Sequence, residues 1–231
     1  MKPKTGVFRF TVRDLKTGKI IRARGNKIRL DGKNFQIDCW THMAIDRSQS
    51  IAIQKLLAAN NLGIKLDLGC GFNKQPGFVG MDKRKVEGVD IVHDAEVFPY
   101  PLPDECCSTI LCSHLIEHIK PWLMIDLFNE LWRIMKVDGQ LMISMPYGVS
   151  FGFQQDPTHC NICNEATWTY FDPDAEGGLY SVYAPMPWKI ERSAWYAHGN
   201  MEVILSKRSA DYVGQFTRKP KIEAKAVTDE T

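Results

Sequence analysis

Short apolar runs, bounded by Gly, Pro, Asn or Asp, divide most of this chain into strands. One longer run with helical periodicity predicts a helix over 121–136, which we expect Asp138-Gly139 to end as a C-terminal cap. The mixture of strands and helix predicts an α/β domain. The predicted strands cover 64–68, 78–82, 89–93, 107–112, 139–145, 188–196 and 200–207, and the last two read as an antiparallel hairpin.

The N-terminal segment shows strict alternation of apolar and basic residues. Phe8, Phe10 and Val12 interleave with Arg9 and Arg13, which gives a strand one apolar face and one cationic face. Turn signals between such runs predict a small β-meander. The predicted organisation is a basic meander over 1–40, a helical connector over 41–61, a main α/β domain over 62–207 and a flexible tail over 208–231.

The segment IKLDLGCGFNKQPGFVGMD carries the strongest functional signal. A strand runs into a glycine turn at Gly69 and Gly71, and a second strand ends in Asp82. Glycine lets the backbone take left-handed torsions and lets a ligand lie against it. Open α/β sheets hold adenosine-type cofactors at such strand ends.

The small number of residues between these two strands helps to distinguish which adenosine-type cofactor is bound. Only the nine residues from Gly69 to Gly77 separate them, whereas a strand–helix–strand crossover takes about 10–12. The first crossover helix must therefore be short or missing. Dinucleotide enzymes use the N-terminus of that helix to hold pyrophosphate. S-adenosylmethionine has no phosphate, so the spacing favours a methyl donor over a nicotinamide dinucleotide.

The blocks that follow complete a resemblance to class I S-adenosylmethionine-dependent methyltransferases, and within them to small enzymes with a shortened loop after the first motif. Val89–Ile119 resembles the adenine-contacting turn, the fourth strand and the helix after it, and Leu127–Pro146 resembles the next helix and fifth strand. The Asp156–His159 segment, DPTH, resembles the start of the acceptor side. The resemblance implies a Rossmann-like sheet of seven strands, mostly parallel with one antiparallel, and S-adenosyl-L-methionine as cofactor.

The resemblance also implies cofactor-binding roles for particular residues. Asp67 would position the methionine end, the backbone of the glycine turn would face the cofactor, and Asp82 would accept both ribose hydroxyls. For each carboxylate the alternative is a turn or helix cap. The implied set is Asp67, Gly69, Cys70, Gly71, Asp82, Lys83, Asp94, Ala95, Ser113 and His114.

Two residues are candidates for a general base. His159 is the first, because the pKa of histidine suits proton transfer near neutral pH, and Glu117 is the second. The alternative for His159 is a structural role that ties the 147–187 region to the sheet.

We expect no metal site from the sequence. His114 and His118 are four residues apart and share a helical face, but a third ligand is not evident. Cys160 and Cys163, beside His159, lack the partner pair that closes a zinc site. The aromatic residues nearby are expected to be mostly packing, with a subset lining an acceptor pocket: Trp168, Tyr170, Phe171, Tyr180, Tyr183 and Trp188.

Charge is distributed unevenly along the 231 residues, whose net charge is +2. Residues 1–33 hold eleven Lys or Arg against two Asp, so this segment is near +9 and the remainder near −7. The basic face is either a solvated surface that protects strand edges, a polyanion contact, or a docking surface for an acidic partner. Seven cysteines, an odd number, indicate reduced thiols and a cytoplasmic location, and no apolar run is long enough for a membrane span.

The methyl acceptor is the least determined feature. The Asp/Asn-Pro-Pro-aromatic turn of enzymes that methylate exocyclic base amines is replaced by Cys-Ser-His-Leu at 112–115, and no Pro-Cys dipeptide occurs. A sugar, a glycan precursor or another small molecule is therefore favoured. The alternatives are a non-enzymatic binding or assembly module and a nucleic-acid methyltransferase guided by the basic face.

Overall fold

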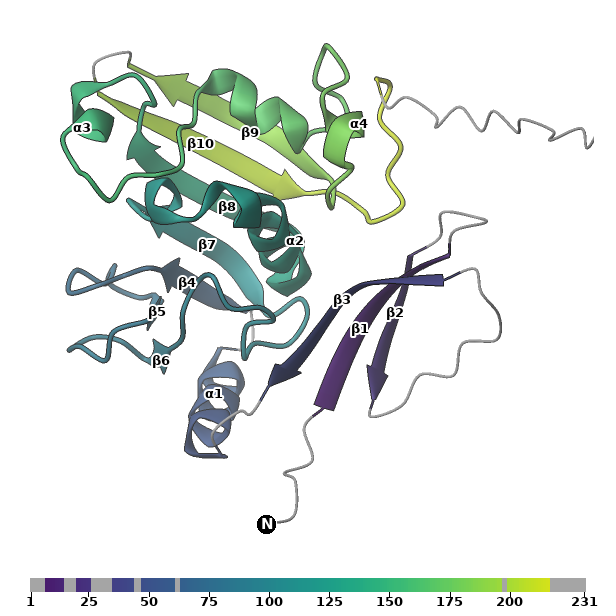
Figure 1. The fold of residues 1–231 in the computed structure, drawn as a ribbon. Helices are drawn as coiled ribbons and strands as arrows, with labels where there is room; N and C mark the ends of the chain where they lie inside the picture. Colours follow the sequence, from purple (N-terminus) through teal and green to yellow (C-terminus); the bar gives the residue numbers. More distant parts are fainter. Residues whose placement is uncertain are drawn as a thin grey trace, which may run out of the picture.

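The computed structural model describes the backbone of residues 7–14, 20–25, 35–43, 47–60, 63–196 and 199–216, with side chains from residue 52 onward. Its main body is a seven-stranded sheet in the order β6-β5-β4-β7-β8-β10-β9 (Figure 1). β10 runs antiparallel to both of its neighbours and the remaining pairs are parallel, as expected for this α/β class. The strands are β4 (Ile64–Leu68), β5 (Val79–Asp82), β6 (Ile91–Val92), β7 (Cys107–Ser113), β8 (Met135–Pro146), β9 (Trp188–Trp195) and β10 (Asn200–Lys207).

One helix covers the middle of this sheet. α2 (Met124–Ile134) lies across β7 and β8 (Figure 1) and buries Leu127, Phe128 and Leu131 at the three- and four-residue spacing of an amphipathic helix. The facing strands alternate, so that every second residue of β10 and of residues 139–145 in β8 is buried. Each fully buried aliphatic or aromatic side chain contributes about 1.5–3 kcal/mol.

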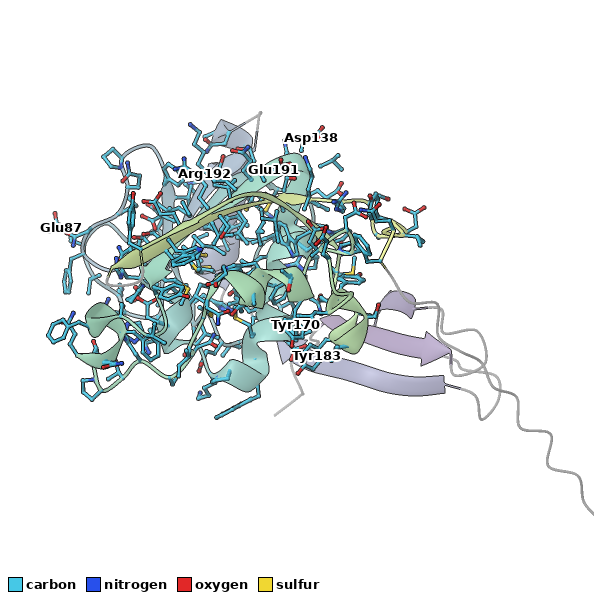
Figure 2. The ribbon with its side chains drawn as sticks, turned by 90° about the horizontal axis from the view of Figure 1, so that it is seen from above. Glu87, Asp138, Tyr170, Tyr183, Glu191 and Arg192 are labelled. Carbon is cyan, nitrogen blue, oxygen red and sulfur yellow. The ribbon has the colours of Figure 1, made fainter. Side chains whose placement is uncertain are left out.

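The end of α2 differs from the sequence prediction. The helix ends at Ile134, and Met135 is already extended because it pairs with Cys107 at the start of β7. The register of that pair then shifts, and Asp138, not Gly139, takes the left-handed torsion, with φ of 62°. Asp138 is exposed at the margin of the molecule (Figure 2). The prediction that Asp138-Gly139 caps the helix was wrong, because the helix already ends at Ile134.

The connections in the half of the sheet that begins at β4 contain no helix. Residues 69–78 between β4 and β5 form turns and irregular backbone, and so do residues 83–90 and 93–106. No helix therefore lies between β4 and β7 along the chain.

The N-terminal strands form a separate three-stranded antiparallel sheet of β1 (Val7–Asp14), β2 (Ile20–Gly25) and β3 (Phe35–Met43). Their order is β2-β1-β3, so β3 pairs with β1 and the arrangement is not the expected β-meander. The nine residues between β2 and β3 are too many for a tight hairpin, and the chain can reach the far edge of β1. The proposed cationic face depends on side chains outside the described residues.

Short helices fill the segments around these sheets. The expected connector helix is α1 (Arg47–Ala59), and η1 (Ile116–His118) and η2 (Pro121–Leu123) precede α2. The 147–187 region holds α3 (Phe151–Gln154), η3 (Glu165–Tyr170) and α4 (Tyr180–Tyr183). Tyr170 and Tyr183 lie together there, with ring centroids 5.6 Å apart (Figure 2). In the described part of the chain, none of the helices combines the length and apolarity needed to cross a bilayer.

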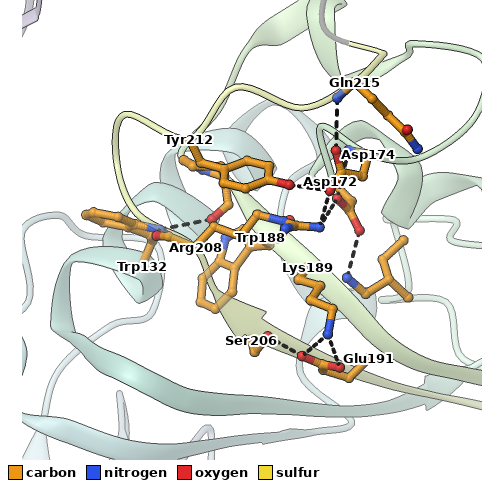
Figure 3. Close-up of polar contacts among 12 residues, drawn as sticks. Trp132, Asp172, Asp174, Trp188, Lys189, Glu191, Ser206, Arg208, Tyr212 and Gln215 are labelled. Carbon is orange, nitrogen blue, oxygen red and sulfur yellow. Dashed lines mark hydrogen bonds and ion pairs between the residues drawn. The ribbon is translucent and has the colours of Figure 1, made fainter.

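The first residues after β10 are held in place, contrary to the prediction of a flexible tail from 208. Arg208 forms ion pairs with Asp172 at 3.1 Å and Asp174 at 2.8 Å (Figure 3). The hydroxyl of Tyr212 and the backbone N–H of Gln215 also donate to Asp174. Residues 208–216 are thus fixed to the domain, and 217–231 lie outside the described residues.

Candidate functional site

The candidate site lies where the chain reverses its direction of travel across the sheet. β4 and β7 are neighbours, yet the chain visits β5 and β6 between them. In open α/β sheets such a switch point is where ligands bind, outside the carboxyl ends of the strands. Gly69 directly follows β4, Asp82 ends β5, and His114 directly follows β7. These three predicted residues therefore gather at this edge of the sheet.

The glycine turn and Asp82 are in direct contact. The backbone N–H of Gly71 donates to Oδ2 of Asp82 at 2.9 Å, and that of Gly69 donates to the carbonyl of Met81 at 2.7 Å. Gly69 and Gly71 have φ of 76° and 52°, which residues with a Cβ rarely adopt. The carboxyl ends of β4 and β5 are therefore in contact, as predicted from the sequence.

Asp82 is buried and held in its ionised form. Burial acts to raise the pKa of this carboxyl group, but hydrogen bonds from Arg84 and from the N–H of Gly71 outweigh it and lower the pKa. Its Oδ1 accepts from the backbone N–H of Arg84 at 2.8 Å and from Nε of Arg84 at 3.1 Å.

Arg84 was missed by the sequence reasoning, which named the adjacent Lys83. Arg84 also stands 5.5 Å from the ring centroid of the exposed Phe72, in a cation–π arrangement. Lys83 is exposed, and Arg84 is the side chain that contacts the carboxylate of Asp82. A basic residue two positions after a strand-ending acid was the available signal.

Asp67 and Asp94 both contact turn amides. The buried Asp67 accepts from the N–H of Gln75 at 2.7 Å, and desolvation raises its pKa against the effects of that bond and of Lys74. Asp94 accepts from the N–H of Glu96 at 3.0 Å, and the adjacent Ala95 is buried. These contacts are the turn caps that stood as alternatives, and they leave cofactor contacts by the same carboxylates as predictions.

Cys70 is buried near the carboxylates of Asp67 and Asp82. Burial, followed by the negative charges of Asp67 and Asp82, raises the pKa of its thiol to about 11. The side chain is therefore a neutral packing group beside the glycine turn.

His114 has a strained backbone at the end of β7. Its φ is 52°, an uncommon value for a residue with a side chain, and such outliers cluster at functional sites. Its Nδ1 donates to Oε1 of Glu117 at 3.2 Å, and this hydrogen bond raises the pKa of His114. The exposed Ser113 precedes it and pairs with Ser144 of β8.

A cavity of about 290 Å³ opens beside His114. Polar and ionisable side chains dominate its lining, and the two candidate bases are among them. The lining residues are His114, Glu117, His118, Pro146, Gly152, Gln155, Asp156, His159 and Asn200. The structure thus brings His159 and Glu117 together, although 42 positions separate them along the chain.

The two candidate bases are held differently. His159 is half-buried. Its Nδ1 donates to the carbonyl of Phe153 at 2.8 Å, so Nε2 takes no part in that hydrogen bond. Glu117 has no exposed surface, and its Oε2 has no hydrogen-bond partner among the described residues. Both groups therefore keep an unused acceptor atom.

His118 joins this pair, which the sequence did not predict. Its ring stands 4.7 Å from that of His159, centroid to centroid. Glu117, His118 and His159 offer ligand atoms that all lie within 4.8 Å of one another, the one such group of three or more His, Cys, Asp or Glu found among the described residues. The sequence pattern had paired His118 with His114, whereas this cluster combines His118 with the adjacent Glu117 and with His159, about forty residues further along the chain.

The other residues of this region have structural roles. Cys163 is buried, Cys160 is exposed with its thiol 3.4 Å from the carbonyl of Ile119, and Asn161 donates to the carbonyl of Ile116 at 3.2 Å. None of the six aromatic residues considered for an acceptor pocket lines the cavity. Trp168, Phe171, Tyr180 and Trp188 are instead part of the buried core.

No protein-family model and no curated protein matches this sequence. Solved structures with a similar fold include a SAM-dependent methyltransferase from Archaeoglobus fulgidus, with 18% identity, a TM-score of 0.47 and coverage of 68% of this chain and 92% of that one. A 16S rRNA (adenine(1408)-N(1))-methyltransferase from Catenulisporales acidiphilia has 13% identity, a TM-score of 0.47 and coverage of 74% and 95%. An S-adenosylmethionine-dependent methyltransferase from Mesorhizobium loti has 11% identity, a TM-score of 0.44 and coverage of 68% and 98%.

Proposed function

We propose that this protein is an S-adenosylmethionine-dependent methyltransferase that acts on an oxygen or nitrogen of a sugar, a glycan precursor or another small molecule. The observation that carries the proposal is the contact between the Gly71 N–H and the buried carboxylate of Asp82 at the switch point of the sheet. Bare backbone on one strand end and an ionised acid on the next are what a nucleoside ligand needs.

The residues present fit the cofactor. A Cβ at Gly71 would lie 3.0 Å from the guanidinium of Arg84, so glycine leaves room here that the exposed Arg84 side chain occupies and would give up to the cofactor. Asp82 would accept the ribose hydroxyls, Asp94 and Ala95 would contact the adenine, and Asp67 would orient the methionine end. Gly69, Cys70, Ser113 and His114 would complete the pocket, and Lys83 would flank the adenine.

The short β4–β5 connection favours this cofactor over a dinucleotide. The described residues between those strands form no helix, so the N-terminus that would bind pyrophosphate is missing. A sulfonium nucleoside needs no such group.

The chemistry requires mainly positioning. When bound, S-adenosylmethionine supplies a methyl group whose C–S bond breaks as the bond to the acceptor forms, leaving S-adenosylhomocysteine. The protein must hold the acceptor atom about 3–3.5 Å from the methyl carbon and in line with the breaking bond. An alcohol acceptor also loses a proton, and Nε2 of His159 and Oε2 of Glu117 are two cavity atoms able to accept it.

The cavity supports a small hydrophilic acceptor. Its volume of about 290 Å³ matches a molecule of monosaccharide size, near the lower end of common ligand pockets at about 300 Å³. Its lining offers imidazole, carboxylate and amide groups and few apolar side chains, as a polyhydroxylated ligand requires.

The proposal is tested by titrating the full chain with S-adenosylhomocysteine in a calorimeter. We expect saturable binding by wild type, and donor-label transfer from S-adenosylmethionine into a small-molecule or glycan fraction of host extract. Absence of binding by a folded sample would favour the non-enzymatic module. Transfer into the nucleic-acid fraction would favour the nucleic-acid alternative, for which an adenine methyltransferase is among the similar folds.

The general base is tested separately. His159→Asn keeps an N–H near the position of Nδ1, and with it the bond to Phe153, but removes Nε2. We expect turnover to fall by about 10²–10⁴-fold, with donor affinity nearly unchanged. Equal loss of turnover and donor affinity would assign His159 a structural role.

A further inference from the structure

The cavity wall holds a cluster that the proposed methyl transfer does not by itself require. We propose that Glu117, His118 and His159 bind a divalent transition-metal ion, with Zn²⁺ as the preferred ion. Their ligand atoms lie within 4.8 Å of one another. Two imidazoles and one carboxylate are a donor set that holds zinc and leaves a fourth position open. Imidazole donors select such ions over Mg²⁺.

The carboxylate of Glu117 has one oxygen that lacks a hydrogen-bond partner among the described residues. Its side chain has no exposed surface, and Oε2 has no hydrogen-bond partner among the described residues. Its other oxygen, Oε1, is held by Nδ1 of His114 at 3.2 Å, which fixes the orientation of the group. A buried charged acceptor left unpaired costs more than the roughly 1–3 kcal/mol of a neutral group. A cation at this position removes that cost.

The imidazole of His118 is held as a metal ligand would be. Oγ1 of Thr158 donates its proton to Oδ1 of Asp156 at 2.7 Å, because an ionised carboxylate can only accept. The same oxygen lies 3.1 Å from Nδ1 of His118, so it accepts the proton carried by that nitrogen. This leaves the lone pair of the His118 ring on Nε2.

His159 is in the same tautomer for an independent reason. Its Nδ1 donates to the backbone carbonyl of Phe153 at 2.8 Å, which again leaves the lone pair on Nε2. Histidine ligands of metals almost always donate their other ring N–H to a carbonyl, a carboxylate or a similar acceptor. Each of the three side chains is therefore oriented by a partner on the side away from the metal.

Small movements close the site. Ligands bonded to zinc at about 2.0–2.2 Å lie roughly 3.4 Å apart in a tetrahedron, so distances within the cluster must shorten by up to about 1.4 Å. His118 is exposed and lies on a single short helical turn, so its ring can pivot without disturbing the core. Oδ2 of Asp156 lies 3.8 Å from Nε2 of His159, and a metal ion bound at Nε2 would replace this contact.

The open coordination position would face the cavity of about 290 Å³ and take an oxygen ligand. If the proposed methyl transfer holds, on which this part of the inference rests, that ligand is an oxygen of the acceptor. His159 would then act as a ligand, and the metal would acidify the bound hydroxyl in place of a direct general base.

The experiment uses the full chain without a histidine tag, freed of metal by a chelator and titrated with Zn²⁺ in a calorimeter. We expect one equivalent of Zn²⁺ to bind and Mg²⁺ not to bind. Glu117→Gln, His118→Asn and His159→Asn each remove one ligand atom, and the two Asn variants keep the Nδ1-type hydrogen bond. We expect each of these to abolish stoichiometric binding.

Two further variants test the orientation of His118 and the alternative that zinc binds to the thiol of Cys160. Thr158→Val removes the acceptor that orients His118 and is expected to weaken zinc binding by about 10–100-fold, with the melting temperature of the metal-free protein unchanged. Cys160→Ser is expected to bind zinc as wild type does. Co²⁺ bound in place of Zn²⁺ should show no sulfur-to-cobalt charge-transfer band.

The outcomes separate this inference from the proposed function. Failure of wild type to bind Zn²⁺, retention of binding by both Asn variants, or loss of binding in Cys160→Ser would overturn the metal site. S-adenosylhomocysteine binding by the metal-free protein is measured in parallel. If the protein binds S-adenosylhomocysteine but not Zn²⁺, only the metal site is refuted. If it binds Zn²⁺ through Glu117, His118 and His159 but does not bind S-adenosylhomocysteine, only the proposed function is refuted.

Discussion

The guanidinium of Arg84 donates through Nε to Oδ1 of Asp82 at 3.1 Å, on the carboxylate that we assign to ribose. The Arg84 side chain is 54% exposed, so solvent screens this ion pair and the pair can open. Arg84→Met should free the carboxylate and raise affinity for S-adenosylhomocysteine by up to about fivefold. Calorimetry measures this change, and a fall in affinity would show instead that Arg84 contacts the cofactor.

Replacement of Asp82 should have the opposite effect. Asp82→Asn removes the charge that strengthens hydrogen bonds to the ribose hydroxyls, bonds worth about 1.5–3 kcal/mol each. We expect affinity for S-adenosylhomocysteine to fall by at least about tenfold. Asp90→Asn is the matched control, because Asp90 accepts from the N–H of Gly80 and from Lys74 at the opposite, amino end of β6. Unchanged affinity in Asp82→Asn would refute the pocket assignment.

Alanine substitutions at Gly69 and Gly77 separate the cost of backbone strain from the cost of steric overlap with a neighbouring side chain. Their φ values are 76° and 79°, so alanine at either position costs about 1–2 kcal/mol through the left-handed backbone alone. A Cβ at Gly69 would also lie 2.9 Å from Leu115, whereas a Cβ at Gly77 would meet nothing within 4 Å. Urea unfolding should therefore show a larger loss of stability for Gly69→Ala than for Gly77→Ala, and equal losses would contradict the contact with Leu115.

The ion pairs of Arg208 should stabilise the domain (Figure 3). Arg208→Met leaves the carboxylates of Asp172 and Asp174 without their cation, and we expect a loss of about 3 kcal/mol in the free energy of unfolding. Lys189→Met removes the exposed pair with Glu191 and should cost less than about 1 kcal/mol. Comparable losses in the two variants would mean that residues 208–216 are not held by these contacts.

Cys70 should resist alkylation despite its place beside the candidate cofactor site. Its pKa of about 11 keeps the thiol protonated at pH 8, and only the thiolate reacts. Iodoacetamide followed by mass spectrometry should label the exposed Cys160 first and Cys70 only after denaturation. Labelling of Cys70 in the folded protein at the rate of Cys160 would contradict the assignment.

The same shift gives stability a pH dependence with a defined sign. The thiol of the unfolded chain ionises near about pH 8.5, whereas that of folded Cys70 stays protonated up to about pH 11. Above pH 8.5 the unfolded state therefore binds fewer protons than the folded state, and stability falls as pH rises. Urea midpoints between pH 7.5 and 10 measure this slope, and Cys70→Ser should reduce it.

The local features of the site were predictable from the sequence. Strands such as β4 and β5 show their pattern over a few residues, and the ten residues between them, 69–78, are at the lower limit for a crossover that contains a helix. Gly69, Gly71 and Asp82 could therefore be assigned to adjoining strand ends before the structure. The helix end at Ile134 could not, because the pairing of Met135 with Cys107 overrides the local signal of Asp138-Gly139.

Sequence by itself determined the elements whose causes are local: the strand periodicity, the glycine turn and the acid that ends β5. Tertiary structure alone decided the pairing of β3 with β1, the anchoring of Arg208, the approach of Arg84 to Asp82, and the meeting of Glu117 and His118 with His159. These depend on contacts between residues far apart along the chain, or on side-chain direction. Periodicity and spacing carry neither kind of information, since both describe only neighbours in sequence.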